Sequence, residues 1–277
     1  MIEVMGLEKH YGKIRAVENL SFRIERGSVF GLLGPNGAGK TTTIKMLTTL
    51  TKPDAGHCFI EGHDVAKDPV KVKRLMGVVP QENNLDRELT AYENLLIYCM
   101  LHGTSDRETK IRSCLQLVDL WDRRDSVVMR FSGGMQRRLL IARSLLTEPS
   151  VLFLDEPSIG LDPQIRRQMW DIIRKTRIDG RTVVITTHYI EEAEVLCDQV
   201  GILAKGSLIA LDTSKNLKAT VGEYIVEFVN GDGKLIQRIC KDREEAHGVA
   251  LCQDCSVTIR KSNLEDVFIK LTGERIE

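Results

Sequence analysis

Gly34-Pro-Asn-Gly-Ala-Gly-Lys40-Thr41 is the stretch of sequence that decides the fold. It fits the pattern G-x-x-x-x-G-K-[S/T], follows an apolar run at residues 29–33 and precedes a helical run at residues 42–50. The small residues let backbone N–H groups approach phosphate oxygens, and the helix N-terminus adds the positive end of its dipole. Lys40 is expected to reach the outer phosphates of a nucleotide, and Thr41 to ligate Mg²⁺. An ordinary glycine-rich turn is the alternative, but it does not account for the lysine, the threonine and the flanking elements together.

The segments around this stretch predict a mostly parallel α/β sheet. Four short apolar runs are separated by helical patterns, and continuous runs of this kind are typical of strands buried on both faces. They lie at residues 29–33, 76–79, 151–154 and 182–186. Residues 2–22, together with 59–60, indicate an antiparallel β layer beside that sheet. The expected fold class is α/β, with a P-loop NTPase sheet and an added antiparallel layer.

Two further segments depart from this pattern. Strand signals are lost between about residues 89 and 130, where helical spacing places charges opposite an apolar face. We interpret this as a helical subdomain inserted at about residues 89–140 into a main domain that spans residues 1–216. Beyond it, alternation at residues 224–229 and a turn at 230–233 predict a β-hairpin. This hairpin opens a small C-terminal appendage, which is expected at residues 217–277.

The run at residues 151–154 ends in two carboxylates, Asp155 and Glu156, followed by Pro157. A buried parallel strand delivers the side chains at its end to the ligand edge of the sheet. Asp155 suits Mg²⁺, usually through water, and Glu156 is then placed to orient or deprotonate an attacking water molecule. Two solvated carboxylates at a strand end are the alternative. The nearby phosphate loop favours the catalytic interpretation.

A second glycine motif, Phe131-Ser-Gly-Gly-Met-Gln136, lies just before that acidic strand. Ser132 is a good N-cap, and the glycines would expose N–H groups at the start of a helix over residues 135–146. The motif resembles the signature of ATP-binding cassette (ABC) ATPases. The resemblance implies a head-to-tail dimer, in which Ser132 and Gly134 of one subunit touch the γ-phosphate held by Lys40 of the other. Alone, the motif could equally be an N-capped helix.

Four more positions match the motifs of this family in order. Tyr11 is similar to the aromatic residue that stacks on adenine, and Gln81 to the glutamine that senses Mg²⁺ and the membrane partner. Asp162 ends a segment, residues 158–162, that resembles the dimer-contacting loop, and His188 resembles the γ-phosphate switch. Taken singly, each has a structural alternative, such as a surface tyrosine, a turn cap, a helix start or a strand-end histidine.

The motifs and the resemblance together predict three sets of site residues. The catalytic set is Glu156, His188 and Lys40, and the metal set is Thr41, Gln81 and Asp155. The set expected to contact ATP comprises Tyr11, Gly34, Pro35, Asn36, Gly37, Ala38, Gly39, Lys40, Thr41, Thr42, Gln81, Ser132, Gly134 and Asp162. The implied cofactors are ATP and Mg²⁺.

Within the family, residues 77–81, 187–194 and 264–268 resemble bacterial exporter cassettes of the drug-resistance, nodulation-factor and sodium-efflux type. Such cassettes pair with a separate transmembrane permease, which selects the transported substrate. A non-transport ABC ATPase of DNA repair or translation is an alternative, although those families usually carry a coiled-coil insertion, a zinc module or a second cassette. A P-loop kinase or GTPase is a further alternative, but it would leave the motif at residues 131–136 unexplained.

Composition sets the remaining expectations for this chain of 277 residues. Its 39 Lys and Arg residues balance 39 Asp and Glu residues, so no global field favours nucleic acid, and no nucleic-acid partner is expected. The longest apolar stretches, such as residues 95–101, are far shorter than the roughly 20 residues that span a bilayer. Residues 1–4 do not resemble a secretory signal, and 7 scattered cysteines suit a reducing compartment. We therefore expect a cytoplasmic protein that lies peripherally on the inner face of the plasma membrane.

Overall fold

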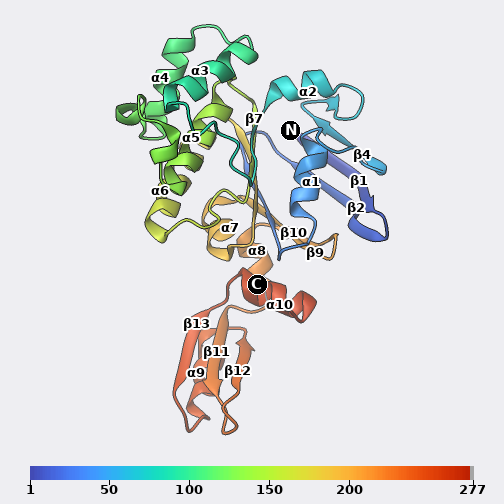
Figure 1. Ribbon diagram of the computed structural model, residues 1–277. Helices are drawn as coiled ribbons and strands as arrows, with labels where there is room; N and C mark the ends of the chain where they lie inside the picture. Colours follow the sequence, from blue (N-terminus) through green and yellow to red (C-terminus); the bar gives the residue numbers. More distant parts are fainter. Residues whose placement is uncertain (275–277) are drawn as a thin grey trace.

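A six-stranded sheet with the strand order β10-β9-β3-β8-β7-β6 forms the centre of the fold (Figure 1). The computed structural model describes residues 1–274. Five of the strands run parallel, and β10 pairs antiparallel with β9 at one edge. The strands are β3 (Val29–Leu33), β6 (Met76–Val79), β7 (Val151–Asp155), β8 (Thr182–Thr187), β9 (Gln199–Ala204) and β10 (Ser207–Asp212). This order places the carboxyl ends of β3, β7 and β8, where the predicted site residues follow, side by side.

A second, antiparallel sheet with the order β2-β1-β4-β5 lies beside the first and confirms the predicted β layer. Its strands are β1 (Ile2–Tyr11), β2 (Ile14–Ile24), β4 (Ala55–Ile60) and β5 (His63–Asp64). Helix α1 (Lys40–Leu47) shares one apolar cluster with this layer and the central sheet, and Phe22 of β2 stacks on Phe30 of β3 at 5.0 Å between ring centroids. The short helix α2 (Pro69–Leu75) leads from the layer into β6.

Helices cover the opposite face of the central sheet. Because side chains alternate along a strand, Val183 and Ile185 of β8 face this helical side, whereas Val184 faces the β layer. The helices are α3 (Ala91–Leu101), α4 (Arg107–Leu117), α5 (Gly133–Leu145), α6 (Pro163–Ile178) and α7 (Ile190–Leu196), with short 3₁₀ turns at Trp121–Arg123 and Val128–Arg130. Thr90 and Glu93 form a capping box that starts α3, so the inserted segment has its own start signal. The α/β fold class with an inserted helical segment is thus confirmed.

The C-terminal part contains a third sheet, of order β12-β11-β13, which stands apart from the rest of the chain (Figure 1). Its elements are α8 (Ser214–Ala219), β11 (Tyr224–Val229), β12 (Leu235–Cys240), α9 (Arg243–Leu251), β13 (Val257–Lys261) and α10 (Leu264–Thr272). Strands β11 and β12 form the predicted hairpin. Helix α10 then returns to the central sheet, where Val267 and Phe268 pack with Val200 and Ile202 of β9. The division at residues 216 and 217 stays a prediction.

Within residues 1–274, none of the helices combines the length and the hydrophobicity that crossing a bilayer requires.

Candidate functional site

The phosphate loop connects β3 to α1 along the path that the sequence predicts. Gly39 has a φ of 102°, and a Cβ atom there would lie 2.4 Å from the carbonyl oxygen of Ala16. A Cβ atom on Gly34 would lie 2.4 Å from the carbonyl oxygen of Leu203 in β9. Both positions therefore need glycine, because the backbone of another strand occupies the space of a side chain. Helix α1 begins at Lys40, two residues before the predicted start, so Lys40 and Thr41 belong to its first turn.

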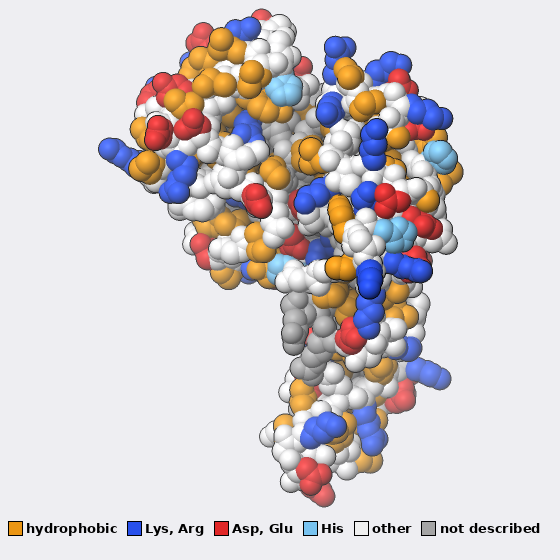
Figure 2. Space-filling view, turned by 45° about the vertical axis from the view of Figure 1, so that its right-hand side comes forward, with side chains coloured by type: hydrophobic (Ala, Val, Ile, Leu, Met, Phe, Trp, Pro, Cys, Tyr) orange, Lys and Arg blue, Asp and Glu red, His pale blue; other side chains and the backbone are white. Residues whose placement is uncertain are grey.

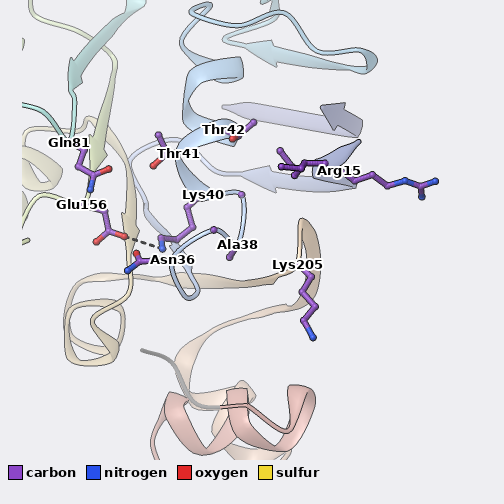
Figure 3. A pocket seen from close by; sticks show the side chains of 13 residues that line it. Arg15, Asn36, Ala38, Lys40, Thr41, Thr42, Gln81, Glu156 and Lys205 are labelled. Atoms are coloured by element: carbon purple, nitrogen blue, oxygen red, sulfur yellow. Dashed lines mark ion pairs between the residues drawn. The ribbon is translucent and has the colours of Figure 1, made fainter. Parts of the chain in front are cut away.

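A pocket of about 550 Å³ opens over this loop (Figure 3). Gln81 and Glu156 lie on one side of Lys40, and Arg15 and Lys205 lie on the other. The residues that line the pocket are Ile14, Arg15, Ala16, Asn36, Gly37, Ala38, Gly39, Lys40, Thr41, Thr42, Gln81, Glu156 and Lys205. The pocket therefore gathers most of the phosphate loop, the predicted glutamine and the predicted catalytic glutamate.

The side chain of Lys40 is buried at the centre of this arrangement. Its Nζ donates hydrogen bonds to the carbonyl oxygens of Gly34 at 2.7 Å and Pro35 at 3.1 Å. The same nitrogen lies 3.1 Å from Oε1 of Glu156, and both side chains are at most 5% exposed. The lysine and the glutamate are thus paired charges beside the pocket, where a phosphate group would find a cation.

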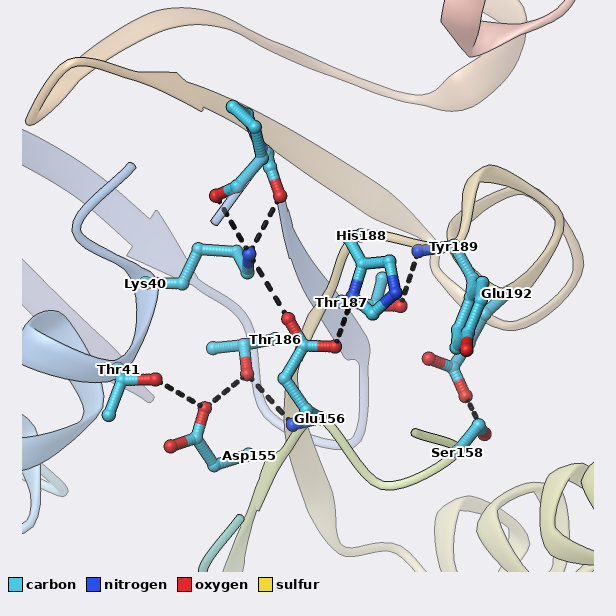
Figure 4. A network of polar contacts seen from close by, with 12 residues as sticks. Lys40, Thr41, Asp155, Glu156, Ser158, Thr186, Thr187, His188, Tyr189 and Glu192 are labelled. Atoms are coloured by element: carbon cyan, nitrogen blue, oxygen red, sulfur yellow. Dashed lines mark hydrogen bonds and ion pairs between the residues drawn. The ribbon is translucent and has the colours of Figure 1, made fainter. Parts of the chain in front are cut away.

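Asp155, at the end of β7, is bonded to two hydroxyl groups (Figure 4). Thr41 Oγ1 donates to its Oδ1 at 3.2 Å, and Thr186 Oγ1 donates to the same oxygen at 2.5 Å. Hydroxyl, carboxylate and amide oxygens are the ligands that Mg²⁺ prefers, and Gln81 lines the same pocket. No group of three His, Cys, Asp or Glu residues within residues 1–274 could hold a metal. Mg²⁺ is usually bound by one or two carboxylates together with substrate phosphates.

Glu156 follows directly and adopts a left-handed backbone conformation, with a φ of 50°. Its N–H donates to Oγ1 of Thr186 at 3.0 Å and to the carbonyl oxygen of Thr186 at 3.2 Å. Its Oε2 lies 2.8 Å from Nδ1 of His188, so the carboxylate joins the histidine to Lys40 (Figure 4). Because such a conformation is strained for a residue other than glycine, the surrounding contacts must hold it in place.

The predicted signature motif lies at the start of α5, outside the pocket described above. Helix α5 begins at Gly133, two residues before the predicted start, and the hydroxyl of Ser132 accepts a hydrogen bond from the N–H of Met135 at 3.3 Å. Ser132 and Gly133 are exposed, whereas Gly134 is buried against Ile165 of α6. The structure therefore does not bring Ser132 and Gly134 into the pocket of their own chain.

Six other predicted residues are outside the pocket lining, namely Gly34, Pro35, Asp155 and His188, which contact lining residues, and Tyr11 and Asp162. Tyr11 ends β1 and is 47% exposed, with Nζ of Lys9 at 5.6 Å from its ring centroid. Asp162 caps α6, where its carboxylate accepts the N–H groups of Gln164 at 3.0 Å and Ile165 at 2.9 Å. These positions leave their nucleotide contacts as predictions.

Several residues of the site were not predicted from the sequence. Thr186 is fully buried and bonded to Asp155, and a buried polar residue at a strand end was a signal that could have revealed it. Glu192 of α7 is also fully buried, receives hydrogen bonds from Ser158 and from Trp170, and burial raises its pKa. Arg15 reaches the pocket from the start of β2 and Lys205 from the turn between β9 and β10, two segments that only the folded chain brings together.

Comparison with known proteins places these motifs in a family. The family described as "ABC transporter" matches residues 17–159. A daunorubicin resistance ATP-binding protein of Streptomyces coeruleorubidus is 39% identical to this chain, over 99% of the chain and 96% of the relative. A Nod factor export ATP-binding protein I of Burkholderia thailandensis is 38% identical, over 100% of the chain and 98% of the relative. A linearmycin resistance ATP-binding protein of Bacillus subtilis is 40% identical, over 80% of the chain and 72% of the relative.

Solved structures show the same fold. An ATP-binding subunit of an ABC transporter superposes with a TM-score of 0.72 at 31% identity, covering 79% of this chain and 92% of the other. A dimeric ATP-binding cassette in a post-hydrolysis state, bound to ADP and Pi, superposes with a TM-score of 0.70 at 28% identity. The superposition covers 77% of this chain and 98% of the other. Since the phosphate loop, the acidic strand end and the signature motif all lie within the family match, this chain belongs to the ABC transporter family and is an ATP-binding cassette.

Proposed function

We propose that this chain is the Mg²⁺-dependent ATPase subunit of an ABC exporter and that it powers transport through a separate membrane permease. The observation that carries the proposal is the contact of Glu156 with both Lys40 and His188, beside the pocket over the phosphate loop. The relatives that match almost the full chain support the export assignment through their names, which refer to drug resistance and to Nod factor export.

In this proposal each predicted catalytic or metal-binding residue has one task. The phosphate loop and Lys40 hold the β- and γ-phosphates, and Glu156 orients or deprotonates the attacking water. His188 senses the γ-phosphate from its position beside Glu156. Thr41, Asp155 and Gln81 would hold Mg²⁺, which would neutralise charge on the phosphate oxygens.

The exposed signature motif supports a head-to-tail dimer. Ser132 lies outside the pocket of its own chain, at the N-terminal end of a 13-residue helix whose dipole favours an anion. In the proposed dimer Ser132 and Gly134 contact the γ-phosphate of the partner subunit's nucleotide, Asp162 contacts the dimer interface and Tyr11 stacks on adenine. One structural relative is described as a dimer bound to ADP and Pi.

The proposed permease contact lies on the helical segment and the loop of Gln81. Helix α3 exposes Met100 at 58% and Leu101 at 79%, and hydrophobic side chains gather over this lobe in Figure 2. Binding there would place the protein peripherally on the inner face of the plasma membrane. With 39 basic and 39 acidic residues, no nucleic-acid partner is proposed.

Purification from native membranes in a mild detergent tests this assignment. A polytopic permease should copurify with the chain, and the purified complex should hydrolyse Mg-ATP. Recovery only with ribosomes or DNA would instead assign the chain to the non-transport ABC ATPases. If the chain hydrolyses ATP but no permease copurifies with it from native membranes, the ATPase assignment would be retained and the export assignment removed.

A further inference from the structure

The guanidinium group of Arg137 lies beneath two loops of the nucleotide site. Arg137 belongs to α5, the helix that begins at the signature motif, and it is 7% exposed. All of its side-chain nitrogens donate to backbone carbonyl oxygens rather than to side chains. The acceptors are the carbonyl oxygens of Pro80, Gln81, Asp155, Glu156 and Pro157.

These acceptors come from the ends of two adjacent strands. Nη1 donates to Pro80, just after β6, and to Gln81 at 3.3 Å. On the β7 side, Nη2 donates to Asp155 at 2.5 Å and to Glu156 at 3.0 Å, and Nε donates to Pro157 at 3.1 Å. One rigid planar group therefore holds together the backbone of the proposed glutamine sensor and that of the proposed catalytic glutamate.

Burying the charge of Arg137 costs free energy that a residue needed only for packing would not have to overcome. Burial lowers its pKa to about 10, so the group stays charged at neutral pH. Among the described residues, no carboxylate oxygen lies within ion-pair distance of it, so its five N–H groups are satisfied by carbonyls alone. Buried charges of this kind are costly relative to an apolar side chain of similar size, which would fill the same space under α5. The carbonyl contacts therefore point to a role in shaping the two loops.

The backbone of Glu156 shows why this shaping matters. Its φ of 50° is unfavourable for a residue with a side chain, and both sides of the residue are held. Thr186 accepts the N–H at 3.0 Å, and Arg137 donates to the C=O at 3.0 Å. The conformation in turn directs the carboxylate toward Lys40 and His188.

We propose that Arg137 is a positioning residue for ATP hydrolysis, which holds the backbones of Glu156 and Gln81 in one fixed relationship to each other and to the signature helix. This inference rests on the proposed ATPase function. In the proposed dimer, α5 contacts the nucleotide held by the partner subunit. Arg137 therefore connects the Glu156 loop of one nucleotide site to the helix that contacts the nucleotide of the second site. It touches neither nucleotide, and it acts through the backbone that it holds.

Arg138, the next residue of the same helix, provides a matched control. It is 9% exposed, and its Nη1 also donates to backbone carbonyl oxygens, those of Val118 at 2.8 Å and Asp119 at 3.4 Å. Those acceptors follow α4 in the helical segment, away from the nucleotide pocket. Arg137→Met and Arg138→Met thus remove the same charge from the same buried helix, and methionine retains much of the apolar stem.

The experiment compares steady-state ATP hydrolysis by the full chain, normalised to the fraction that binds ATP. Arg137→Met should lower kcat by about 10- to 100-fold, with the ATP dissociation constant within about threefold of the parent, because misplacement by about 1 Å costs rate rather than binding. Arg137→Lys keeps the charge but loses the planar guanidinium group. Its kcat should therefore lie between that of Arg137→Met and that of the parent. Arg138→Met should retain the parental kcat, whatever its melting temperature.

Three results would overturn the assignment. The first is an equal kcat for Arg137→Met and Arg138→Met, and the second is a loss of ATP affinity in Arg137→Met with no loss of kcat. The third is a failure of both Arg137 variants to fold while Arg138→Met folds, which would assign Arg137 to stability alone. A failure of the proposed function is distinct from these. In that case the parent itself would hydrolyse no more ATP than Glu156→Gln.

Discussion

Nδ1 of His188 lies 2.8 Å from Oε2 of Glu156, while Oε1 of the same carboxylate lies 3.1 Å from Nζ of Lys40. One carboxylate thus joins the ends of β7 and β8 to the phosphate loop, three segments that are far apart in the chain. Its two oxygens have different partners, so the group is held in a set orientation. A group that orients water needs such an orientation.

The first prediction concerns Glu156→Gln. Glutamine keeps the shape of the side chain and removes the negative charge, so hydrolysis should fall by about 10² to 10⁴ while ATP binding is retained. Phosphate release and equilibrium ATP binding by the purified protein measure the two effects. Asp171→Asn removes a carboxylate from the exposed face of α6 and should leave the rate unchanged. A parental rate in Glu156→Gln would withdraw the catalytic assignment.

A second prediction concerns the proposed dimer. Because nucleotide would lie at the interface of that dimer, Glu156→Gln should accumulate an ATP-bound dimer, which light scattering with Mg-ATP detects. Adding Ser132→Arg should block that dimer by steric and charge conflict at an exposed position. Adding Ser113→Arg, which places the same charge on the exposed face of α4, is the control and should leave the dimer intact. Dimerisation of the Ser132→Arg double variant at the level of Glu156→Gln would remove the signature motif from the interface.

Of the two neighbouring glycines at the start of α5, only one should lose stability when it is replaced by alanine. A Cβ atom on Gly134 would lie 2.5 Å from Cγ2 of Ile165, whereas one on Gly133 meets nothing within 4 Å. Gly134→Ala should therefore lower the free energy of unfolding by about 1–3 kcal/mol through overpacking. Gly133→Ala should be neutral or raise it by up to about 1 kcal/mol through the reduced entropy of the unfolded chain. Urea denaturation of the two variants measures both values, and equal shifts would contradict the packing of α5 on α6.

The buried carboxyl of Glu192 predicts a pH dependence of stability. Burial raises its pKa above the ordinary value of 4.5, so the folded protein holds a proton that the unfolded chain releases at lower pH. The stability contributed by this proton is fully present below about pH 4.5 and is lost as the pH rises through the higher folded pKa. Glu192→Gln cannot titrate, and the glutamine oxygen can still accept from Ser158 and Trp170.

The melting temperature of Glu192→Gln, relative to the parent, should therefore increase between about pH 5 and about pH 8. Each kcal/mol of relative stability corresponds to roughly 2–4 °C in a protein of this size. Glu191→Gln, at an exposed position on the same helix, should show no such trend. A pH-independent difference for Glu192→Gln would mean that this carboxyl has the same pKa in the folded and unfolded protein.

Much of the fold could be predicted because its signals are local. The phosphate loop lies between its predicted strand and helix, and β3 and β6 have the predicted bounds. Strands β7 and β8 each extend one residue further, to Asp155 and Thr187. Strands β9 and β10 were not predicted, although Lys205-Gly206 between them, with a φ of 84° at the glycine, is a two-residue turn signal.

The contacts of the site could not be predicted to the same extent. Arg137 donates to carbonyl groups that are 57 and 20 residues away in the sequence, and backbone carbonyls carry no residue type that a pattern could detect. Glu192 and Ser158, which are 34 residues apart, meet only because α7 packs on β3, β8 and α6, close to the loop that follows β7. The roles of Tyr11 and Asp162 stay predictions, because both depend on a nucleotide or a partner subunit.

The return of α10 to the central sheet has a consequence for how the protein is made. Val267 and Phe268 belong to an apolar cluster that also includes Leu33, Val200 and Ile202, three strand residues that are translated much earlier. Until α10 has been synthesised, those strand residues lack the side chains that cover them, and the nascent chain exposes an incomplete core next to β9. This part of the core can therefore close only after α10 has been synthesised. A chain that is truncated within the third sheet would lack α10, and Leu33, Val200 and Ile202 of the central sheet would lose the cover that Val267 and Phe268 provide.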